Sequence, residues 1–182
     1  MDLVLLKPGN DQIVGESLIQ GELAGGNKDD LSKCIELVSI HYSMKQQITT
    51  DVSNSARTSG RPELTDITAI KYFDQASTTL YKHCLAAIPL DTGKADEYTK
   101  IYLCRNSNDT IANIMTIELK DAIISSIECQ SHPNDMPTEQ LTINFTAVNW
   151  IYNSQLNNMS DGGVKVAGWT VSENHGMPPA PK

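Results

Sequence analysis

The chain has 182 residues, of which 40% are hydrophobic and 20% are charged. This length allows one well-filled core and is short for two domains. The formal net charge of −8 disfavours nucleic acid and anionic membrane surfaces as partners, because both repel an acidic chain.

Nothing in the sequence favours membrane insertion, a signal peptide or disulfide bonds. No window approaches the ~18 apolar residues that a membrane helix needs. The first ten residues, MDLVLLKPGN, lack a basic region and a sufficient apolar run, so we expect no cleaved secretory signal. The four cysteines, at 34, 84, 104 and 129, form no CxxC pair, and we expect reduced structural thiols.

Short strand patterns and polar segments alternate in the first part of the chain. Asp2–Lys7 has a strand pattern and ends at a Pro-Gly-Asn turn, and residues 14–30, which hold four glycines, are expected to be a loop. A second strand is predicted from Cys34 to Met44. Its alternate apolar residues share one side: Val38, Ile40, Tyr42 and Met44.

Residues 45–62 have no periodicity and are rich in Ser, Thr, Asn, Arg and Gly. A segment of this length without structure is uncommon in a compact domain. It is therefore either functional, for example by docking onto a neighbour, or a hairpin extension that periodicity does not reveal.

Residues 66–73 have another strand pattern and lead into the one convincing helix. Asp74 is a good N-cap residue, and residues 75–88 carry one apolar stripe at helical spacing, which predicts a helix over that range. Pro89 ends the element, because it disfavours helical angles at the residue before it.

Four further strands are predicted in the second half of the chain, over residues 97–104, 111–120, 122–129 and 138–152. A last short strand is indicated by Val164, Val166, Trp169 and Val171. Residues 173–182 are expected to be a flexible tail.

The strand pattern at 138–152 changes face along its length. Up to Ala147 the apolar residues fall on odd positions, and from Val148 to Tyr152 they fall on even ones. A slip of one residue moves every later side chain to the opposite face. This strand is therefore predicted to bend or to serve two apolar surfaces, as in a folded-over or closed sheet.

Together these patterns predict a mainly β protein: an antiparallel β-barrel or sandwich of two sheets with one α-helix packed alongside. We expect a single domain over residues 1–172. Its predicted core includes the following residues: Phe73, Leu80, Ile117, Phe145 and Trp150.

The sequence does not support catalysis, a cofactor or a metal site. Its four histidines are isolated, and the glycines of residues 162–168 lack the spacing of a phosphate-binding loop. His83 and Cys84 are unsuited to joint chelation, because adjacent helix positions point about 100° apart. The acidic pairs at 29–30 and 96–97 fit solvated loops better than a glycosidase pair. We therefore expect a protein that is not an enzyme.

Three segments, taken in chain order, resemble a known family. They are Ile13–Ser17 (IVGES), Lys71–Leu80 (KYFDQASTTL), and Glu139 with Ala147–Tyr152 (AVNWIY) and the glycines and tryptophan of residues 162–169. This ordered set is similar to the Hcp (hemolysin-coregulated protein) family, which forms the inner tube of the bacterial type VI secretion system.

The resemblance implies a β-barrel of two sheets with one helix, whose subunits close into hexameric rings. The rings would stack into a tube inside a contractile sheath, and contraction would drive the tube, a spike protein and small effectors carried in its lumen into a neighbouring cell. The subunit would reside in the bacterial cytoplasm during assembly. It would be exported without a signal peptide to the extracellular space or a target cell.

The resemblance also assigns the segment 45–62 as an extended loop that contacts the next subunit or ring. Candidate residues of the subunit and ring interface lie in this loop and in the last strand. They are Lys45, Gln46, Thr49, Asp51, Asn54, Arg57, Arg61 and Trp169.

Two alternatives stay open. One is a non-catalytic β-sandwich that binds carbohydrate or protein, with Trp150 and Trp169 in an aromatic platform. The other is the tube protein of a related phage-tail-like contractile device. A strict monomer whose fluorescence responds to a ligand would favour the first, and the neighbouring genes would separate the second from a secretion system.

Overall fold

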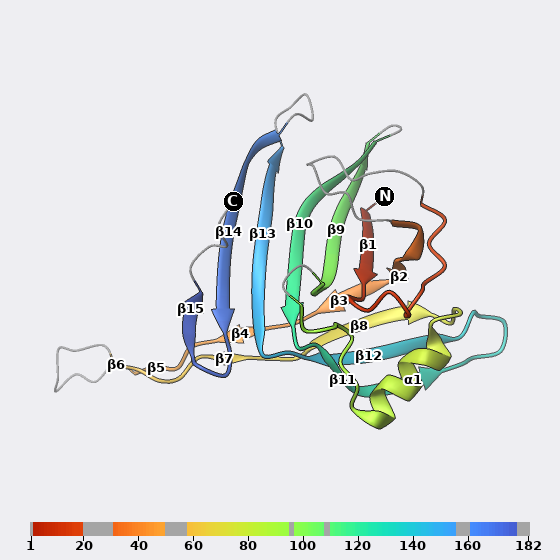
Figure 1. Ribbon diagram of the computed structural model, residues 1–182, viewed down its shortest axis with the longest axis horizontal. Helices are drawn as coiled ribbons and strands as arrows, with labels where there is room; N and C mark the ends of the chain where they lie inside the picture. Colours follow the sequence, from red (N-terminus) through yellow and green to blue (C-terminus); the bar gives the residue numbers. More distant parts are fainter. Residues whose placement is uncertain are drawn as a thin grey trace.

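Two antiparallel sheets make up most of the protein (Figure 1). The computed structural model describes residues 2–19, 31–49, 58–94, 97–107, 110–155 and 161–177. In Figure 1 the long strands of one sheet run across those of the other, and the helix lies beside the second sheet. The fold is thus mainly β with a single α-helix in the described residues, as the sequence predicts.

The larger sheet has seven strands in the order β15-β14-β13-β10-β9-β1-β2. Their bounds are β15 His175–Met177, β14 Asp161–Thr170, β13 Ala147–Gln155, β10 Thr110–Lys120, β9 Thr99–Ser107, β1 Asp2–Lys7 and β2 Ile35–Leu37. All neighbouring pairs are antiparallel.

The smaller sheet has four strands in the order β11-β12-β8-β3. Their bounds are β11 Ile123–Gln130, β12 Thr138–Asn144, β8 Ile67–Tyr72 and β3 Ser39–His41. A 3-10 turn, η1 (Leu31–Lys33), precedes β2, and the helix α1 covers Ser77–Ala86. Within the described residues no helix is long and apolar enough to cross a membrane.

The sheets form a sandwich and do not close into one barrel within the described residues. The seven-stranded sheet ends at β15 and β2, and the four-stranded sheet ends at β11 and β3. Of the two forms that the sequence allows, the sandwich of two sheets is therefore the one that the structure has.

The main core lies between the two sheets. Ile67 and Leu141 contribute to it from the four-stranded sheet, and Ile117 and Val148 contribute from the seven-stranded sheet. A smaller apolar cluster, which includes Leu5, lies on the other face of the seven-stranded sheet. β1 has its successive residues Leu5 and Leu6 in different clusters, because side chains alternate between the faces of a strand.

The change of face predicted near Ala147 occurs where the chain passes from one sheet to the other. β12 ends at Asn144, and β13 begins at Ala147. Between them, Thr146 donates its backbone N–H to Lys120 O, and its own carbonyl accepts from Val171 N, over 3.0 and 2.8 Å. The predicted fold-over of the sheet is confirmed, because the chain passes here from one sheet to the other. A second apolar surface is not found, because Leu141 before the slip and Val148 after it belong to the same core.

The strand predicted from Cys34 to Met44 is wrong as a single element. The chain there forms β2, β3 and β4 (Met44–Lys45), which belong to three different sheets. Val38 and Met44, expected on a buried side, are 52% and 61% exposed. A period-two pattern does not persist here because the chain moves between sheets within a few residues.

The helix is shorter at both ends than the predicted range of 75–88. Asp74 accepts a hydrogen bond from Ala76 N over 2.9 Å in a turn before the helix, which then begins at Ser77. At the other end, Ala87 adopts a left-handed conformation with φ of 50° and donates to Cys84 O. This left-handed residue, rather than Pro89, ends the helix.

Of the predicted core residues, Leu80, Ile117 and Phe145 are buried, whereas Phe73 is wrongly placed and is 39% exposed. β8 ends at Tyr72, so Phe73 lies beyond the buried alternation of that strand, where its backbone N–H donates to Pro137 O. Trp150 is partly buried and packs against the core.

The expected flexible tail is wrong for its first part, because His175–Met177 form β15 on the edge of the seven-stranded sheet. A close approach holds this strand: a Cβ on Gly168 of β14 would lie 2.3 Å from Asn149 Oδ1 and 3.2 Å from Met177 Cβ. Only glycine fits there without displacement. Residues 178–182 lie outside the described residues.

Gly168→Ala is expected to destabilise the protein by about 1–3 kcal/mol, because the added methyl overpacks the β13–β14–β15 edge. Urea denaturation measures the loss. Gly176→Ala is the matched control, since its Cβ would have no neighbour closer than 3.8 Å and should change little. Equal losses in the two variants would contradict this account.

Candidate functional site

The segment after β3 forms a projecting arm of paired strands. β4 pairs with β7 (Glu63–Leu64), and β5 (Ile48–Thr49) pairs with β6 (Thr58–Ser59). Gly60 N donates to Gln47 O over 2.8 Å between the two ribbons. Figure 1 shows this arm extending away from both sheets. Residues 45–62 were predicted to be either a docking segment or a hairpin extension. The described residues of this segment form a hairpin extension.

The arm brings together some of the candidate interface residues. Lys45 and Gln46 lie in and after β4, and Thr49 lies in β5. Arg61 precedes β7, and its Nη2 donates to Val171 O over 3.3 Å, which ties the base of the arm to the end of β14. Asp51, Asn54 and Arg57 lie outside the described residues.

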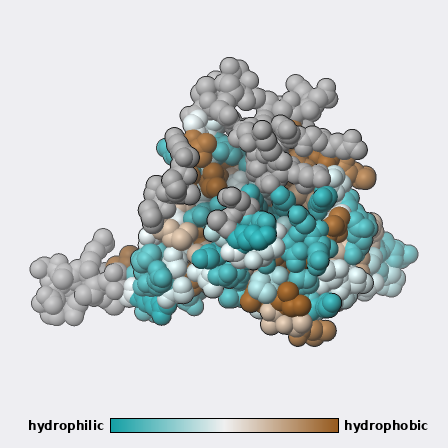
Figure 2. All heavy atoms as spheres, in the orientation of Figure 1, coloured by the Kyte–Doolittle hydropathy of each residue, from teal (hydrophilic) through white to brown (hydrophobic). Residues whose placement is uncertain are grey.

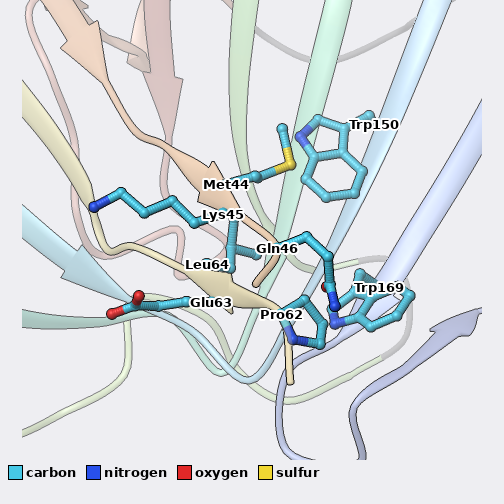
Figure 3. Close-up of a pocket in the computed structure, with 8 residues that line it drawn as sticks. All are labelled: Met44, Lys45, Gln46, Pro62, Glu63, Leu64, Trp150 and Trp169. Carbon is cyan, nitrogen blue, oxygen red and sulfur yellow. The ribbon is translucent and has the colours of Figure 1, made fainter. Parts of the chain in front are cut away.

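A groove of about 330 Å³ lies between the base of the arm and the seven-stranded sheet (Figure 3). The arm contributes its residues from β4 and β7, and the sheet contributes one tryptophan from β13 and one from β14. The lining residues are Met44, Lys45, Gln46, Pro62, Glu63, Leu64, Trp150 and Trp169. Three predicted interface residues, Lys45, Gln46 and Trp169, therefore share one groove.

The two tryptophans share a face of the sheet. Trp150 pairs with Ala167, and Trp169 is two residues further along the same strand, so the two side chains are diagonal neighbours. The indole nitrogen of Trp150 is buried and has no hydrogen-bond partner among the residues that the structure describes. Met44 of β4 and Trp150 line the same groove (Figure 3).

A buried ionic cluster joins the helix to the smaller sheet. Lys71 of β8 and Glu139 of β12 are cross-strand partners, both fully buried, with Nζ 2.8 Å from Oε2. Ser77 Oγ, at the start of the helix, donates to the same carboxylate oxygen over 2.9 Å. Asp74 Oδ1 lies 2.9 Å from Lys71 Nζ.

Tyr81 extends this cluster toward the surface. Its hydroxyl donates to Glu139 Oε1 and lies 3.4 Å from the sulfur of the exposed Cys129. Burial raises the pKa of Tyr81, and its contacts with Cys129 and Glu139 raise it further. Tyr81 therefore stays a hydrogen-bond donor to the carboxylate at ordinary pH.

The cluster contains a serine beside a lysine, a pairing that some hydrolases use, but its geometry does not suit a nucleophile. Ser77 and Lys71 are buried, at 3% and 0% exposure. The Lys71 amine also donates to Tyr72 O and Glu139 as well as Ser77, which engages all three ammonium protons. The geometry of the cluster instead suits the joining of the helix to the smaller sheet.

The segment Ile13–Ser17 contacts the residues before β2 and the second motif, Lys71–Leu80. Gly15 N donates to Lys33 O over 2.9 Å, and a Cβ on Gly15 would lie 2.1 Å from Cys34 O, so only glycine fits. Gly15 O accepts from Gln75 Nε2 over 2.7 Å, directly before the helix. All three segments of the family resemblance thus have structural roles at element junctions or in the groove.

The sequence reading missed both the buried cluster and the groove. A usable signal existed for the cluster, since Lys71 and Glu139 continue the buried alternations of Ile67-Ala69 and Leu141-Ile143. The groove had no such signal, because its lining comes from four separate parts of the chain: residues 44–46, residues 62–64, Trp150 and Trp169.

The described cysteines are all free, and they differ in environment. Burial raises the pKa of Cys104 to about 12, from an ordinary value of 9.0. A thiol whose pKa is higher in the folded state stabilises that state fully below pH 9 and loses this contribution as the pH rises toward 12. Among the described residues, no group of three or more His, Cys, Asp or Glu side chains is placed to hold a metal ion.

We therefore expect stability to fall between pH 9 and about 12 more steeply in the parent protein than in Cys104→Ala. Urea midpoints measured across this range check the difference in slope. Cys84→Ala is the control, because Cys84 is a free cysteine that is only half-buried, and it should keep the parent slope. Identical slopes for the parent and Cys104→Ala would contradict the assignment.

A second exposed apolar surface lies at the C-terminal end of the helix (Figure 2). Leu85 is 89% exposed and Ile88 is 37% exposed. Leu80, on the opposite side of the helix, is fully buried. The helix therefore has an apolar end that the two sheets leave uncovered.

Comparison with known proteins identifies the fold and the family. Three solved structures share the fold: "Structure of a type six secretion system protein" (TM-score 0.79, 19% identity, 97% of this chain and 100% of that chain), Hcp1 from Salmonella typhimurium (0.66, 20%, 97% and 99%) and a type VI secretion system effector from Yersinia pestis (0.62, 20%, 92% and 99%). No curated protein matches the sequence.

A family match carries the identification further than these structural likenesses do. The sequence model of the family described as "Type VI secretion system effector, Hcp" matches residues 11–152. This range includes the first two resembling segments, the arm, and Trp150 of the groove. Because the match spans well over half of the sequence, the chain belongs to the Hcp family of the type VI secretion system.

Proposed function

We propose that the protein is a structural subunit of the secretion tube, which closes into hexameric rings that stack end to end. The observation that carries this proposal is the projecting arm of β4 to β7, which extends away from both sheets of its own subunit. A surface that reaches beyond its own core is suited to a heterologous contact. Such a contact closes into a ring when its rotation divides a full turn.

The edges of the sheets support the same proposal. β15 and β2 end the larger sheet, and β11 and β3 end the smaller one, so each subunit presents strand edges. Unpaired edges are ready sites for association. In the assembled tube, the arm residues Lys45, Gln46, Thr49 and Arg61 would contact a neighbour, with Asp51, Asn54 and Arg57 of the same segment.

The partners and compartments follow from this role. The tube would assemble in the bacterial cytoplasm inside a contractile sheath, topped by a spike protein, with small effectors in the lumen. It would then leave the cell without a signal peptide, toward the extracellular space or a target cell. Its function would be mechanical delivery rather than catalysis.

Negative-stain microscopy and native mass spectrometry of the purified chain test the proposal. We expect rings and a particle of six times the 20.0 kDa chain mass. A protein that stays monomeric at high concentration, with no rings on the grid, would argue against the tube and for the alternative of a binding module. Sheath and spike genes beside its own gene would separate a secretion tube from a phage-tail-like device.

A further inference from the structure

Two apolar surfaces remain open to solvent in the described part of the chain. One is the groove at the base of the arm, whose lining includes the only two tryptophans of the sequence. The other is the end of the helix, where four consecutive apolar residues are all exposed: Leu85, Ala86, Ala87 and Ile88. A continuous exposed apolar patch commonly marks a contact with another protein.

The charged residues of the groove do not face its tryptophans. Lys45 and Glu63 are cross-strand partners in the β4–β7 ribbon. In Figure 3 the ammonium of one and the carboxylate of the other lie on the same side of the ribbon, away from the two indoles. Because the two charges are opposite in sign and are neighbours across the ribbon, they largely offset each other. An occupant beside Trp150 and Trp169 should therefore be apolar and uncharged.

The helix end matches the groove in size and in charge. A cavity of about 150 Å³ holds a group the size of benzene. The groove has about 330 Å³, so it has room for two aliphatic side chains. Leu85 and Ile88, which are 89% and 37% exposed, are two such side chains on one short segment. No residue from 85 to 88 is charged.

The two surfaces are also complementary in hydrogen bonding. The usual helical partner of the Leu85 carbonyl would be an N–H at Pro89, which proline lacks. Ile88 N, the next nearest donor, donates to His83 O instead. The groove has the opposite group, because the buried indole N–H of Trp150 has no acceptor among the described residues.

The two surfaces lie on different sides of the molecule, so they meet only between copies. In Figure 1 the arm leaves the sheets on the left, and the helix lies on the right. The helix packs against β11 of the smaller sheet, whereas the groove lies against β13 and β14 of the larger sheet. Contact between two different patches of identical chains is heterologous, and its repetition generates rings or filaments.

We propose that the exposed end of the helix, residues 85–88, docks in the groove at the base of the arm of a neighbouring copy. Its two aliphatic side chains enter the groove against the indoles, and the Leu85 carbonyl accepts the Trp150 N–H. Met44, which is 61% exposed and has a flexible side chain, moves to admit them. This contact rests on the proposed assembly of the subunits and names two surfaces that the assembly joins.

Disulfide cross-linking between copies tests this contact. The variant Met44→Cys, Leu85→Cys carries one new thiol at each surface, in a Cys129→Ser background because Cys129 is exposed. Oxidation should link neighbouring copies into a ladder of dimers, trimers and larger species on a non-reducing gel. The matched control is Met44→Cys, Met136→Cys in the same background, because Met136 is also exposed but lies in the turn between β11 and β12. The first variant should form at least about 10-fold more ladder, since a disulfide requires Cα atoms within about 7 Å.

A charge placed at the helix end gives a second readout. Leu85→Glu should lower the fraction of assembled protein in native mass spectrometry at least about 10-fold, because the contact would bury a carboxylate without a partner. Met136→Glu, the matched control, should assemble as the parent does. Both side chains are exposed in the single chain, so both variants should keep the parent urea midpoint.

The outcomes separate this contact from the tube itself. Rings in the parent, with no more ladder from the first cysteine variant than from its control, would overturn the contact and leave the tube in place. An absence of rings in the parent would overturn both. Dimers from Leu85→Cys alone, without a ladder from the double variant, would show that like surfaces meet and would overturn the pairing of helix end with groove.

Discussion

Lys71→Met is expected to lower the free energy of unfolding by about 3–5 kcal/mol, because it leaves a buried carboxylate without its counter-ion. Glu139 is fully buried, and Lys71 contacts both Glu139 and Asp74. Methionine keeps most of the volume of lysine, so the loss reports on charge rather than on a cavity. Urea denaturation monitored by circular dichroism measures it.

Two further variants show whether the ionic cluster is the cause. Lys94→Met removes the lysine of a solvent-exposed pair with Glu97, in which the lysine is 75% exposed, and should change stability by no more than about 0.5 kcal/mol. The double variant Lys71→Met, Glu139→Leu should recover much of the loss, because it removes both buried charges. If Lys71→Met costs no more than Lys94→Met, the cluster does not hold helix and sheet together.

Replacing residues 45–62 by a short Gly-Ser linker is expected to abolish ring stacking while leaving both sheets folded. Within the described residues, the strands of the arm pair with one another, as β4 with β7 and β5 with β6, so the two main sheets lose no described ladder partner. The shortened chain should keep its strand signal in circular dichroism. Electron microscopy should show single rings or unassembled subunits instead of tubes.

A matched control replaces the exposed turn at 132–136, between β11 and β12, by a Gly-Ser linker of equal length. This variant should assemble as the parent does. Tubes of normal length from the arm variant would contradict the proposed role of the arm. Loss of assembly in both variants would show that general destabilisation, rather than the arm, is responsible.

Periodicity predicts a strand correctly where that strand keeps the same face buried over several residues. The bounds predicted for Asp2–Lys7 are those of β1, and the slip at Ala147 correctly indicates where the chain folds over from one sheet to the other. The arm escaped detection because each of its strands has two residues, too few to show a period. Cys34–Met44 was misread because the chain changes sheets within it.

Charge explains what the sequence reading missed at the helix–sheet junction. In strands whose residues alternate between a buried and an exposed face, a lysine or a glutamate is ordinarily assigned to the solvent-exposed face. Lys71 and Glu139 occupy the buried face because each supplies the other's counter-charge across the strand pair. Trp150, predicted as core, turns out to divide its surface between the core and the groove.

The position of β1 has a consequence for how the chain reaches its native state. β1 lies between β2 and β9, and Asp2 faces Arg105 across the β1–β9 ladder. During synthesis this strand has its partner β2 early and must wait for its second partner until β9 (Thr99–Ser107) has been made. Such distant pairing slows folding and exposes an unpaired apolar strand in the interval. The apolar side chains of β1 therefore remain without the cover of their second partner strand until β9 has been made.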